Sequence, residues 1–409
     1  MKKPKIFFFL SVWGEKYTNF FLEFCLSSLL SKNNLKILNP NDNRFLIACP
    51  KKEWQKILKH PVTKLAKKYI KFHHLPLKPI KKSESPIKKM GEGHIQATEI
   101  CFKNRALGVA LTPDLMLSDS IVKTILENYK KKIEILLMPA LRFEQESIFK
   151  NLQKEGYLTK ETKSIFLKPI NARKLSKIAI RSLHCETDYY RYENKYINKN
   201  CVMPALIFEL PSQNGFIFKC MSWLPIYIDY SKIDNHDIST IRDWSIDGDY
   251  IDKNFGSNRR IRVINESIDG IVVSWSKKDE NIESFKSKKY FYRNSFISKT
   301  LKSSFFRFNA RGKIFDNLKR NLLKQNNFFI DDKLKKTKEF YDIRQKCINA
   351  TNLEKNIFFD IVLNNLFFRL FSFFSLLFSR LKVLLSCVIL FNSIHCKTIT
   401  DSLKRRKII

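Results

Sequence analysis

Two short acidic motifs carry the residue types that metal binding and proton transfer require. Thr112-Pro113-Asp114 directly follows the apolar segment 106–111. A carboxylate there can hold a divalent cation that bridges a diphosphate, because Mg²⁺ and Mn²⁺ prefer oxygen ligands and keep coordination positions for substrate phosphates. The structural alternative is that Pro113 and Asp114 open a turn, and that Ser118 and Asp119 cap the next helix. Spacing alone favours this alternative, because single short motifs often match by chance.

The second acidic motif is Asp247-Gly248-Asp249. Its two carboxylates flank a glycine that permits close approach of the backbone, which suits a general base or a further metal ligand. A solvated turn after Trp244 explains the motif equally well, since Asp-Gly is a common turn pair. Both interpretations stay open at the level of sequence.

Two histidines are candidates for contacts with phosphate or metal, because imidazole serves both purposes. They are His94 and His184. A lone histidine also caps helices or lies at the surface, and the position of His184 at the end of a helical segment suits a helix C-cap.

One arginine and two aromatic side chains complete the set of candidate ligand contacts. Arg142 can clamp a diphosphate through two parallel hydrogen bonds; its alternative is a surface ion pair with Glu144 or Glu146. Trp13 and Tyr17 can stack on a nucleobase. Core packing is the alternative for both rings, and the helical phase of Tyr17 favours it.

The elements that must position these residues alternate between strand and helix. The predicted strands are 5–12, 44–49, 69–77, 106–111 and 133–138. The predicted helices between them lie within 17–30, 51–68, 93–105 and 118–129. Strands that are apolar throughout indicate a mostly parallel sheet with helices on both faces. Ligands of such sheets bind beyond the carboxyl ends of the strands, so Trp13-Gly14-Glu15 and Asp114 are expected along one edge.

The chain changes character after residue 175. A helix is predicted at 175–186, and segments 206–210 and 216–220 are expected to form a hairpin, because Asn214 and Gly215 both accept positive φ. Segments 260–265 and 270–275 suggest a second pair of strands.

The composition is strongly basic, with 75 Lys and Arg against 39 Asp and Glu and a net charge of +36. The positive electrostatic field of such a charge attracts phosphates and anionic membranes, but it does not identify a specific partner. The surplus of Lys, Ile, Phe and Asn is typical of an A/T-rich genome, so a solvated surface is the preferred interpretation of the lysine-rich stretch 51–89. The nine scattered cysteines show no C-x-x-C spacing, which favours reduced thiols. The apolar start at 6–13 is read as a buried strand rather than a signal peptide, because Glu15 and Lys16 follow it.

The C-terminal third is basic and then apolar. Residues 277–355 carry a net charge of +12, and the apolar stretch 357–394 is interrupted too often by charges for a spanning helix of roughly 20 residues. Arg369 and Arg380 project from nearly one side of a helix, which predicts a helix in the membrane interface. The basic tail 404–407 adds to this pattern.

The motifs from residue 5 to about 275 resemble a poorly characterised family of bacterial glycosyltransferase-like proteins. The match opens with a strand, then Trp13-Gly14-x-x-Tyr17, and a helix ending in Ser28-Leu29-Leu30 and Asn34-Leu35. It continues in the same order with Gly93-His94, Pro113 to Asp119, Leu141-Arg142 with Glu144, Leu183-His184 and Asp247-Gly248-Asp249-Tyr250.

This resemblance implies a GT-A-like nucleotide-sugar transferase fold. In that fold an Asp-x-Asp motif follows the fourth strand, and its last carboxylate binds the Mn²⁺ or Mg²⁺ of a nucleotide sugar. Only that last carboxylate, Asp114, is present here. For a glycosyltransferase of this kind, the chemistry of the residues makes Asp247 or Asp249 the expected general base and places Arg142 at the diphosphate.

The sequence therefore predicts an α/β protein with three parts: a glycosyltransferase-like domain at 1–275 with a mostly parallel GT-A-like or Rossmann-like sheet and an antiparallel hairpin region, a basic helical extension at 276–355, and an amphipathic C-terminus at 356–409. The predicted function is transfer of a sugar from a nucleotide-sugar donor to a cell-envelope or lipid-linked acceptor. We expect a cytoplasmic enzyme that lies peripherally on the inner face of an anionic membrane. The alternatives are a non-catalytic relative that binds nucleotide or glycan, and a basic nucleic-acid-binding protein, for which only the bulk charge speaks.

Overall fold

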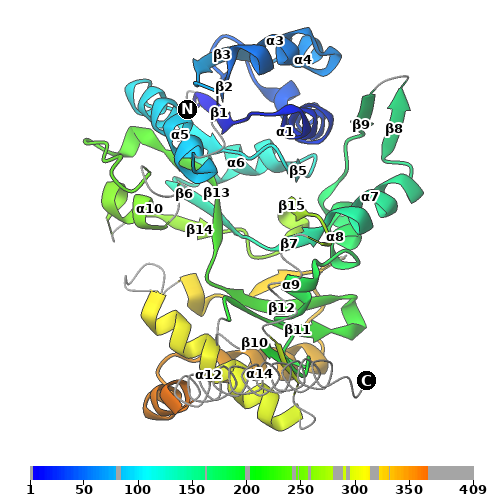
Figure 1. Ribbon diagram of the computed structural model, residues 1–409, viewed down its shortest axis with the longest axis vertical. Coiled ribbons are helices and arrows are strands. Elements are labelled where there is room, and N and C mark those ends of the chain that lie inside the picture. The colour runs from blue at the N-terminus through cyan, green and yellow to red at the C-terminus, as the bar shows by residue number, and fades with distance from the viewer. Residues whose placement is uncertain are drawn as a thin grey trace, which may run out of the picture.

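The computed structural model describes residues 3–79, 84–161, 164–198, 203–241, 246, 248–256, 259–279, 289–291, 295–313, 322–330 and 332–366. Figure 1 shows a large sheet covered by helices and, beneath it, a smaller sheet with long helices formed by later parts of the chain.

The main sheet has seven strands in the order β14-β6-β13-β4-β1-β2-β3. They are β1 (Ile6–Ser11), β2 (Arg44–Cys49), β3 (Lys71–Pro76), β4 (Leu107–Ala110), β6 (Ile135–Pro139), β13 (Trp223–Asp229) and β14 (Ile261–Val263). Every pairing is parallel except those of β13, which runs antiparallel to both β4 and β6. The predicted α/β class and mostly parallel sheet are confirmed.

Helices cover both faces of this sheet, because the side chains of its strands alternate between two apolar clusters. Phe8 and Leu10 point to one face, and Phe7 and Phe9 point to the other. The first face is covered by α1 (Glu15–Phe20), the π-helix η1 (Phe21–Leu26), α2 (Ser27–Leu29), α3 (Lys51–Lys59), α4 (Pro61–Ala66) and α6 (Ile121–Lys130). The second face is covered by α5 (Pro86–Lys103) and α10 (Gly248–Phe255).

A small three-stranded sheet extends the carboxyl edge of the main sheet. It consists of β5 (Leu115–Leu117), β15 (Val272–Ser276) and β7 (Arg142–Glu144), with β15 in the centre. The expected pairing of 260–265 with 270–275 is wrong, because β14 joins β6 in the main sheet while β15 joins β5 and β7. Beside this sheet lie α7 (Gln145–Lys154), the hairpin of β8 (Leu158–Glu161) and β9 (Ser164–Leu167), α8 (Ala172–Ile180) and α9 (Cys185–Asp188).

The predicted hairpin is confirmed as β11 (Ala205–Leu210) and β12 (Gly215–Cys220), joined through the 3₁₀ turn η3 (Pro211–Gln213). Asn214 takes the left-handed conformation with φ 46°, as expected. Gly215 serves a different purpose from the one predicted: a Cβ there would lie 2.3 Å from the carbonyl oxygen of Phe329. The glycine lets β17 (Asn327–Phe329) pair closely with β12.

This hairpin packs with the C-terminal helices. Its strands share a third apolar cluster with α12 (Ser295–Lys313) and α14 (Lys338–Thr351), below the main sheet in Figure 1. The short strands β10 (Tyr196–Asn198) and β16 (Lys289–Phe291) pair beside them. The segment 205–220 thus contributes to the same packed unit as residues beyond 276. The predicted boundary at residue 275 stays a prediction.

The chain becomes helical again at 357–366, where the description ends. No helix among the described residues is long and apolar enough to cross a bilayer. The predicted interfacial helix around Arg369 and Arg380, and the basic tail at 404–407, lie outside the described residues. No disulfide joins the six cysteines in the described part of the chain.

Candidate functional site

The motifs after the first and fourth strands leave the main sheet at the same edge. β1 and β4 are parallel neighbours with Phe9 opposite Ala110, and the amide of Leu111 donates to the carbonyl of Phe9 at 2.9 Å. Trp13-Gly14-Glu15 and the turn at Pro113-Asp114 follow these two strands. The expectation that they lie along one carboxyl edge is therefore confirmed.

The turn after β1 depends on Gly14. Its φ of 73° lies in the region that favours glycine, and an added Cβ would meet no atom within 4 Å, so the backbone conformation and not crowding requires it. The amide of Gly14 donates to Glu53 Oε1 at 3.4 Å, and Lys56 Nζ pairs with Glu15 at 3.3 Å. The turn is thereby tied to α3, which starts at the carboxyl end of β2.

The two aromatic candidates near this turn are both partly accessible. Trp13 is half-buried. Tyr17 is 39% exposed and packs edge-on against Phe20, so the core position expected for Tyr17 is wrong. Sequence reasoning missed Glu53 and Lys56 as neighbours of this turn. Their position in the helix that follows the second strand is the signal that places them at this edge.

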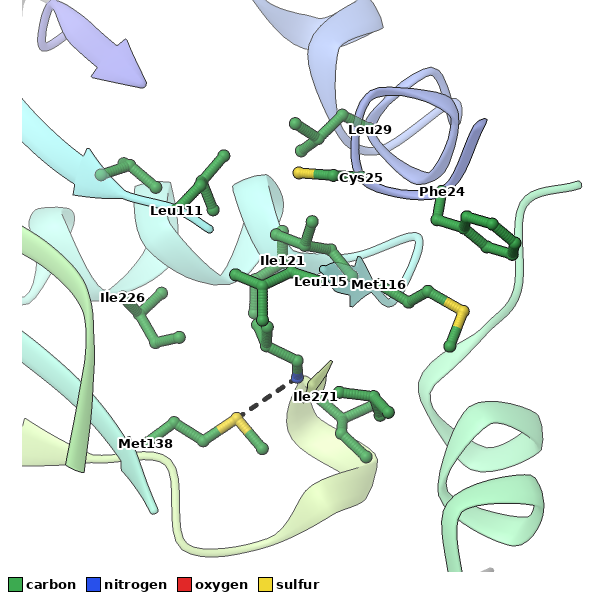
Figure 2. Packing of buried hydrophobic residues seen from close by; sticks show 14 of the residues in the cluster. Phe24, Cys25, Leu29, Leu111, Leu115, Met116, Ile121, Met138, Ile226 and Ile271 are labelled. Carbon is green, nitrogen blue, oxygen red and sulfur yellow. Dashed lines mark hydrogen bonds between the residues drawn. The ribbon is translucent and has the colours of Figure 1, made fainter. Parts of the chain in front are cut away.

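Asp114 is half-buried in the turn between β4 and β5. Burial and the charge of Asp114 together raise the pKa of the Cys25 thiol in η1, which places the carboxylate on the side of the sheet that α1 to α2 cover. Figure 2 shows Cys25 near Leu115 and Leu111, the residues that flank the Asp114 turn.

The alternative to a metal site, a turn at Pro113-Asp114 followed by a helix cap at Ser118-Asp119, is confirmed only for the turn. Pro113 and Asp114 form a turn, but Ser118 is not a helix cap. Its hydroxyl accepts a hydrogen bond from the amide of Ile271 at 3.2 Å, and Ser120 occupies the N-cap position of α6 without a side-chain bond.

A divalent cation can bind at Asp114 only if most of its ligands come from outside the protein. The described residues contain no group of three or more His, Cys, Asp or Glu side chains that could hold a metal ion. A cation on Asp114 would take its other ligands from a substrate diphosphate and water, which is how Mg²⁺ commonly binds in nucleotide enzymes.

The second acidic motif lies apart from Asp114. Asp247 is outside the described residues, and Asp249 is exposed in the first turn of α10. Tyr250 and Ile251 of α10 pack with Phe7 and Phe9, on the face opposite to Cys25. The structure therefore does not bring Asp249 to the side of the sheet that holds Asp114.

His94 lies between α5 and the main sheet. It is 4% exposed, it stands edge-on to Phe9 with 5.7 Å between ring centroids, and neither ring nitrogen has a hydrogen-bond partner. Burial lowers its pKa to about 4. The preceding Gly93 permits this packing, since a Cβ there would lie 2.2 Å from Ser11 Oγ and 2.5 Å from Ala48 Cβ.

His184 caps the start of a helix and not the end of one. Its Nδ1 accepts from the amide of Glu186 at 3.2 Å at the N-terminus of α9, so Nε2 is the donor to the carbonyl of Lys277 at 3.1 Å. The buried ring joins α9 to the chain after β15. Its expected C-cap role is wrong, and both nitrogens are engaged within the protein.

Arg142 is exposed at the start of β7, just beyond the carboxyl end of β6. Burial and the carboxylate of Glu186 raise the pKa of Tyr190, and the charge of Arg142 acts in the opposite direction, so the guanidinium lies near the Tyr190 hydroxyl. Glu146 accepts instead from the amide of Lys278 at 2.9 Å. Arg142 stands at the same carboxyl edge as Trp13 and Asp114.

No protein-family description matches the chain, and no curated protein sequence matches it. Among solved structures, the chain has a distant match to a protein described as a glucose-1-phosphate thymidylyltransferase from Bacillus anthracis, in complex with sucrose. The sequence identity is 13% and the TM-score is 0.22, with 40% of this chain and 64% of that chain covered. The match thus spans less than two thirds of that protein.

Proposed function

We propose that the protein is a nucleotide-sugar-dependent glycosyltransferase whose donor binds at the carboxyl edge of the main sheet. The observation that carries the proposal is the shared edge of the Gly14 turn and the Asp114 turn, which leave the neighbouring parallel strands β1 and β4. Crevices beyond the carboxyl ends of such strands are the usual ligand sites of doubly wound sheets. The resemblance of the motifs to glycosyltransferase-like proteins supports the same location.

The proposed roles follow from the chemistry of each group. Asp114 would hold a divalent cation that offsets the charge of the donor diphosphate, Arg142 binds a phosphate oxygen, and Trp13 stacks on the base. The predicted general-base role of Asp249 is not part of this proposal, because α10 carries Asp249 on the face of the sheet opposite to Asp114; the base that takes the proton of the acceptor hydroxyl is left unassigned. The hydroxyl oxygen then bonds to the anomeric carbon of the sugar, and the nucleoside diphosphate leaves with the electron pair of the broken bond.

A thermal-shift panel of nucleoside diphosphates, each with and without Mn²⁺, tests the donor site. We expect a Mn²⁺-dependent rise in melting temperature with at least one base, and loss of the Mn²⁺-dependent part in Asp114→Asn. Asp234→Asn is the matched control, because Asp234 is an exposed carboxylate that follows β13 at the opposite edge. A shift that ignores Asp114→Asn would refute the assignment of the metal site.

A non-catalytic nucleotide-binding relative is the second candidate. One carboxylate follows β4 where the resembled motif has two, which favours this alternative. Saturable binding of a nucleotide sugar, without release of nucleoside diphosphate across donors and acceptors, would support it.

We propose that the acceptor is lipid-linked or part of the cell envelope and that the C-terminus brings the enzyme to an anionic membrane. A chain that ends at Leu366 tests this without disturbing Asp360, which is buried against Arg307 and Arg311. Equal binding of this shortened chain and the full chain to anionic vesicles would contradict a C-terminal anchor. Salt-sensitive binding to nucleic acid without any binding of nucleotide sugar would favour the third alternative.

A further inference from the structure

A cleft opens at the amino edge of the main sheet, opposite to the edge that holds Asp114. It lies between the end of α6, the start of β6, the end of β13 and the start of β14, and its volume is about 440 Å³. Its lining is mostly polar or charged and consists of Tyr129, Lys132, Ile133, Glu134, Asp229, Lys232 and Arg260.

Three cations stand at the mouth of this cleft. Lys132, Lys232 and Arg260 are exposed and line the same opening. None of the three forms an ion pair with another described residue. Like charges repel one another, so their convergence without a protein partner favours an anion between them.

The conformation of Lys132 is the second observation. It has a φ of 60° directly after α6, and its amide donates to the carbonyl of Tyr129 at 2.8 Å, as in a helix-terminating turn. Glycine is the residue that this position favours, because a side chain is strained at positive φ. A lysine thus occupies a position of the cleft where glycine would remove the backbone strain of the positive φ.

The inner part of the cleft carries acceptors. Asp229 is 2% exposed, and its Oδ1 accepts from the amide and hydroxyl of Ser231 at 3.0 and 2.6 Å. Glu134 lies 3.7 Å from Arg259, beside the cleft. Burial and Asp229 raise the pKa of Tyr129, which places its ring and hydroxyl near this carboxylate. Carboxylates at such depth accept hydrogen bonds from hydroxyl groups.

We propose that this cleft binds a phosphorylated sugar or polyol, with the phosphate on the three cations and the hydroxyl groups on Asp229 and Glu134. Phosphate alone leaves the carboxylates unused, and a continuous polyanion would be repelled by them. The site is separate from the proposed donor site, because it opens at the other end of the parallel strands.

Calorimetry and thermal-shift measurements test this inference. The full chain is titrated separately with glucose 6-phosphate, glucose and inorganic phosphate. We expect glucose 6-phosphate to bind at least tenfold more tightly than inorganic phosphate, and glucose to give no shift. Lys232→Gln and Arg260→Gln should each weaken binding several-fold. Lys132→Gly should weaken binding and at the same time raise the melting temperature of the free protein, since it removes a cation and relieves the backbone.

Two control variants separate this site from general charge and from the donor site. Lys131→Gln removes the same charge from the exposed neighbour of Lys132 that does not line the cleft, and should leave binding intact. Asp114→Asn should also leave it intact. The inference is overturned if glucose 6-phosphate does not bind. It is also overturned if the double variant Lys132→Gly/Lys232→Gln binds glucose 6-phosphate as tightly as the parent, or if Asp114→Asn is the only variant that abolishes this binding.

Discussion

Asp360 accepts two parallel hydrogen bonds from Arg307, from Nε at 2.8 Å and from Nη2 at 2.6 Å, and both side chains are almost fully buried. Arg311 Nη1 adds a third bond to the same carboxylate at 2.6 Å. This cluster fastens the helical segment 357–366 to α12.

Asp360→Asn is expected to lower the free energy of unfolding by about 3–5 kcal/mol, because it leaves buried guanidinium charge without its partner. Urea denaturation of the full chain measures the loss. Glu127→Gln is the control, since Glu127 pairs with Lys123 at the surface and both are more than half exposed; it should change stability by less than about 0.5 kcal/mol. An Asp360→Asn loss as small as that of the control would contradict the buried pair.

Gly93→Ala is expected to destabilise the protein by about 1–3 kcal/mol through overpacking. The added methyl group would meet Ser11 Oγ at 2.2 Å and Ala48 Cβ at 2.5 Å, so α5 must move away from β1 and β2. Lys88→Ala, at an exposed position of the same helix, provides the comparison. If thermal melting shows both variants equally stable, α5 does not approach the sheet this closely.

His94 is expected to make the fold sensitive to acid. Its folded pKa of about 4 lies below the ordinary value of 6.5, so the unfolded chain binds the proton more readily. Stability is therefore fully present above pH 6.5 and is lost as the pH falls towards 4, by about 2 kcal/mol between pH 7.5 and 5.

His94→Phe should remove this part of the pH dependence, because neither ring nitrogen has a partner to lose. Urea denaturation at pH 7.5 and pH 5 gives the free energy of unfolding of the variant and of the parent. All other titrating groups are the same in both, so the comparison isolates the contribution of His94. An unchanged difference between pH 7.5 and 5 in the variant would mean that His94 is not the group responsible.

Lys219→Met is expected to cost about 1–3 kcal/mol. The buried Nζ of Lys219 donates to the carbonyls of Leu323, Lys324 and Gln325 at 2.9, 2.7 and 2.8 Å. The substitution therefore leaves the three carbonyls of segment 323–325 without their donor. Lys324→Met, which alters an exposed side chain of the same segment, is the control. Chemical denaturation should separate the two variants clearly.

The order of strands and helices in the first 140 residues was predictable, because apolar strands and amphipathic helices leave distinct periodicities. The common edge of the Gly14 and Asp114 turns followed from that order. The role of β13 did not follow, since Pro225 argues against a central strand. The structure accommodates the proline at an irregularity of the pairing between Pro225 and Tyr227.

Local chemistry was harder to assign than the elements. Gly215 suggested positive φ, yet a carbonyl of β17, more than a hundred residues later, explains it. His184 suggested a C-cap, yet its contact with Lys277 depends on a strand whose pairing the sequence did not reveal. In each case the deciding neighbour is remote in the chain, and periodicity carries no information about it.

The central position of β13 has a consequence for the order in which the protein can assemble. β3, β2, β1 and β4 form one ribbon and β6 with β14 forms another, and β13 is the strand that pairs with both. During synthesis β4 has one unpaired side and β6 has two until residues 223–229 emerge, some eighty residues after β6, and β14 follows only at 261–263. Completion of the sheet is therefore a late, long-range step, of the kind that slows folding, and the nascent chain is exposed to mispairing during that interval.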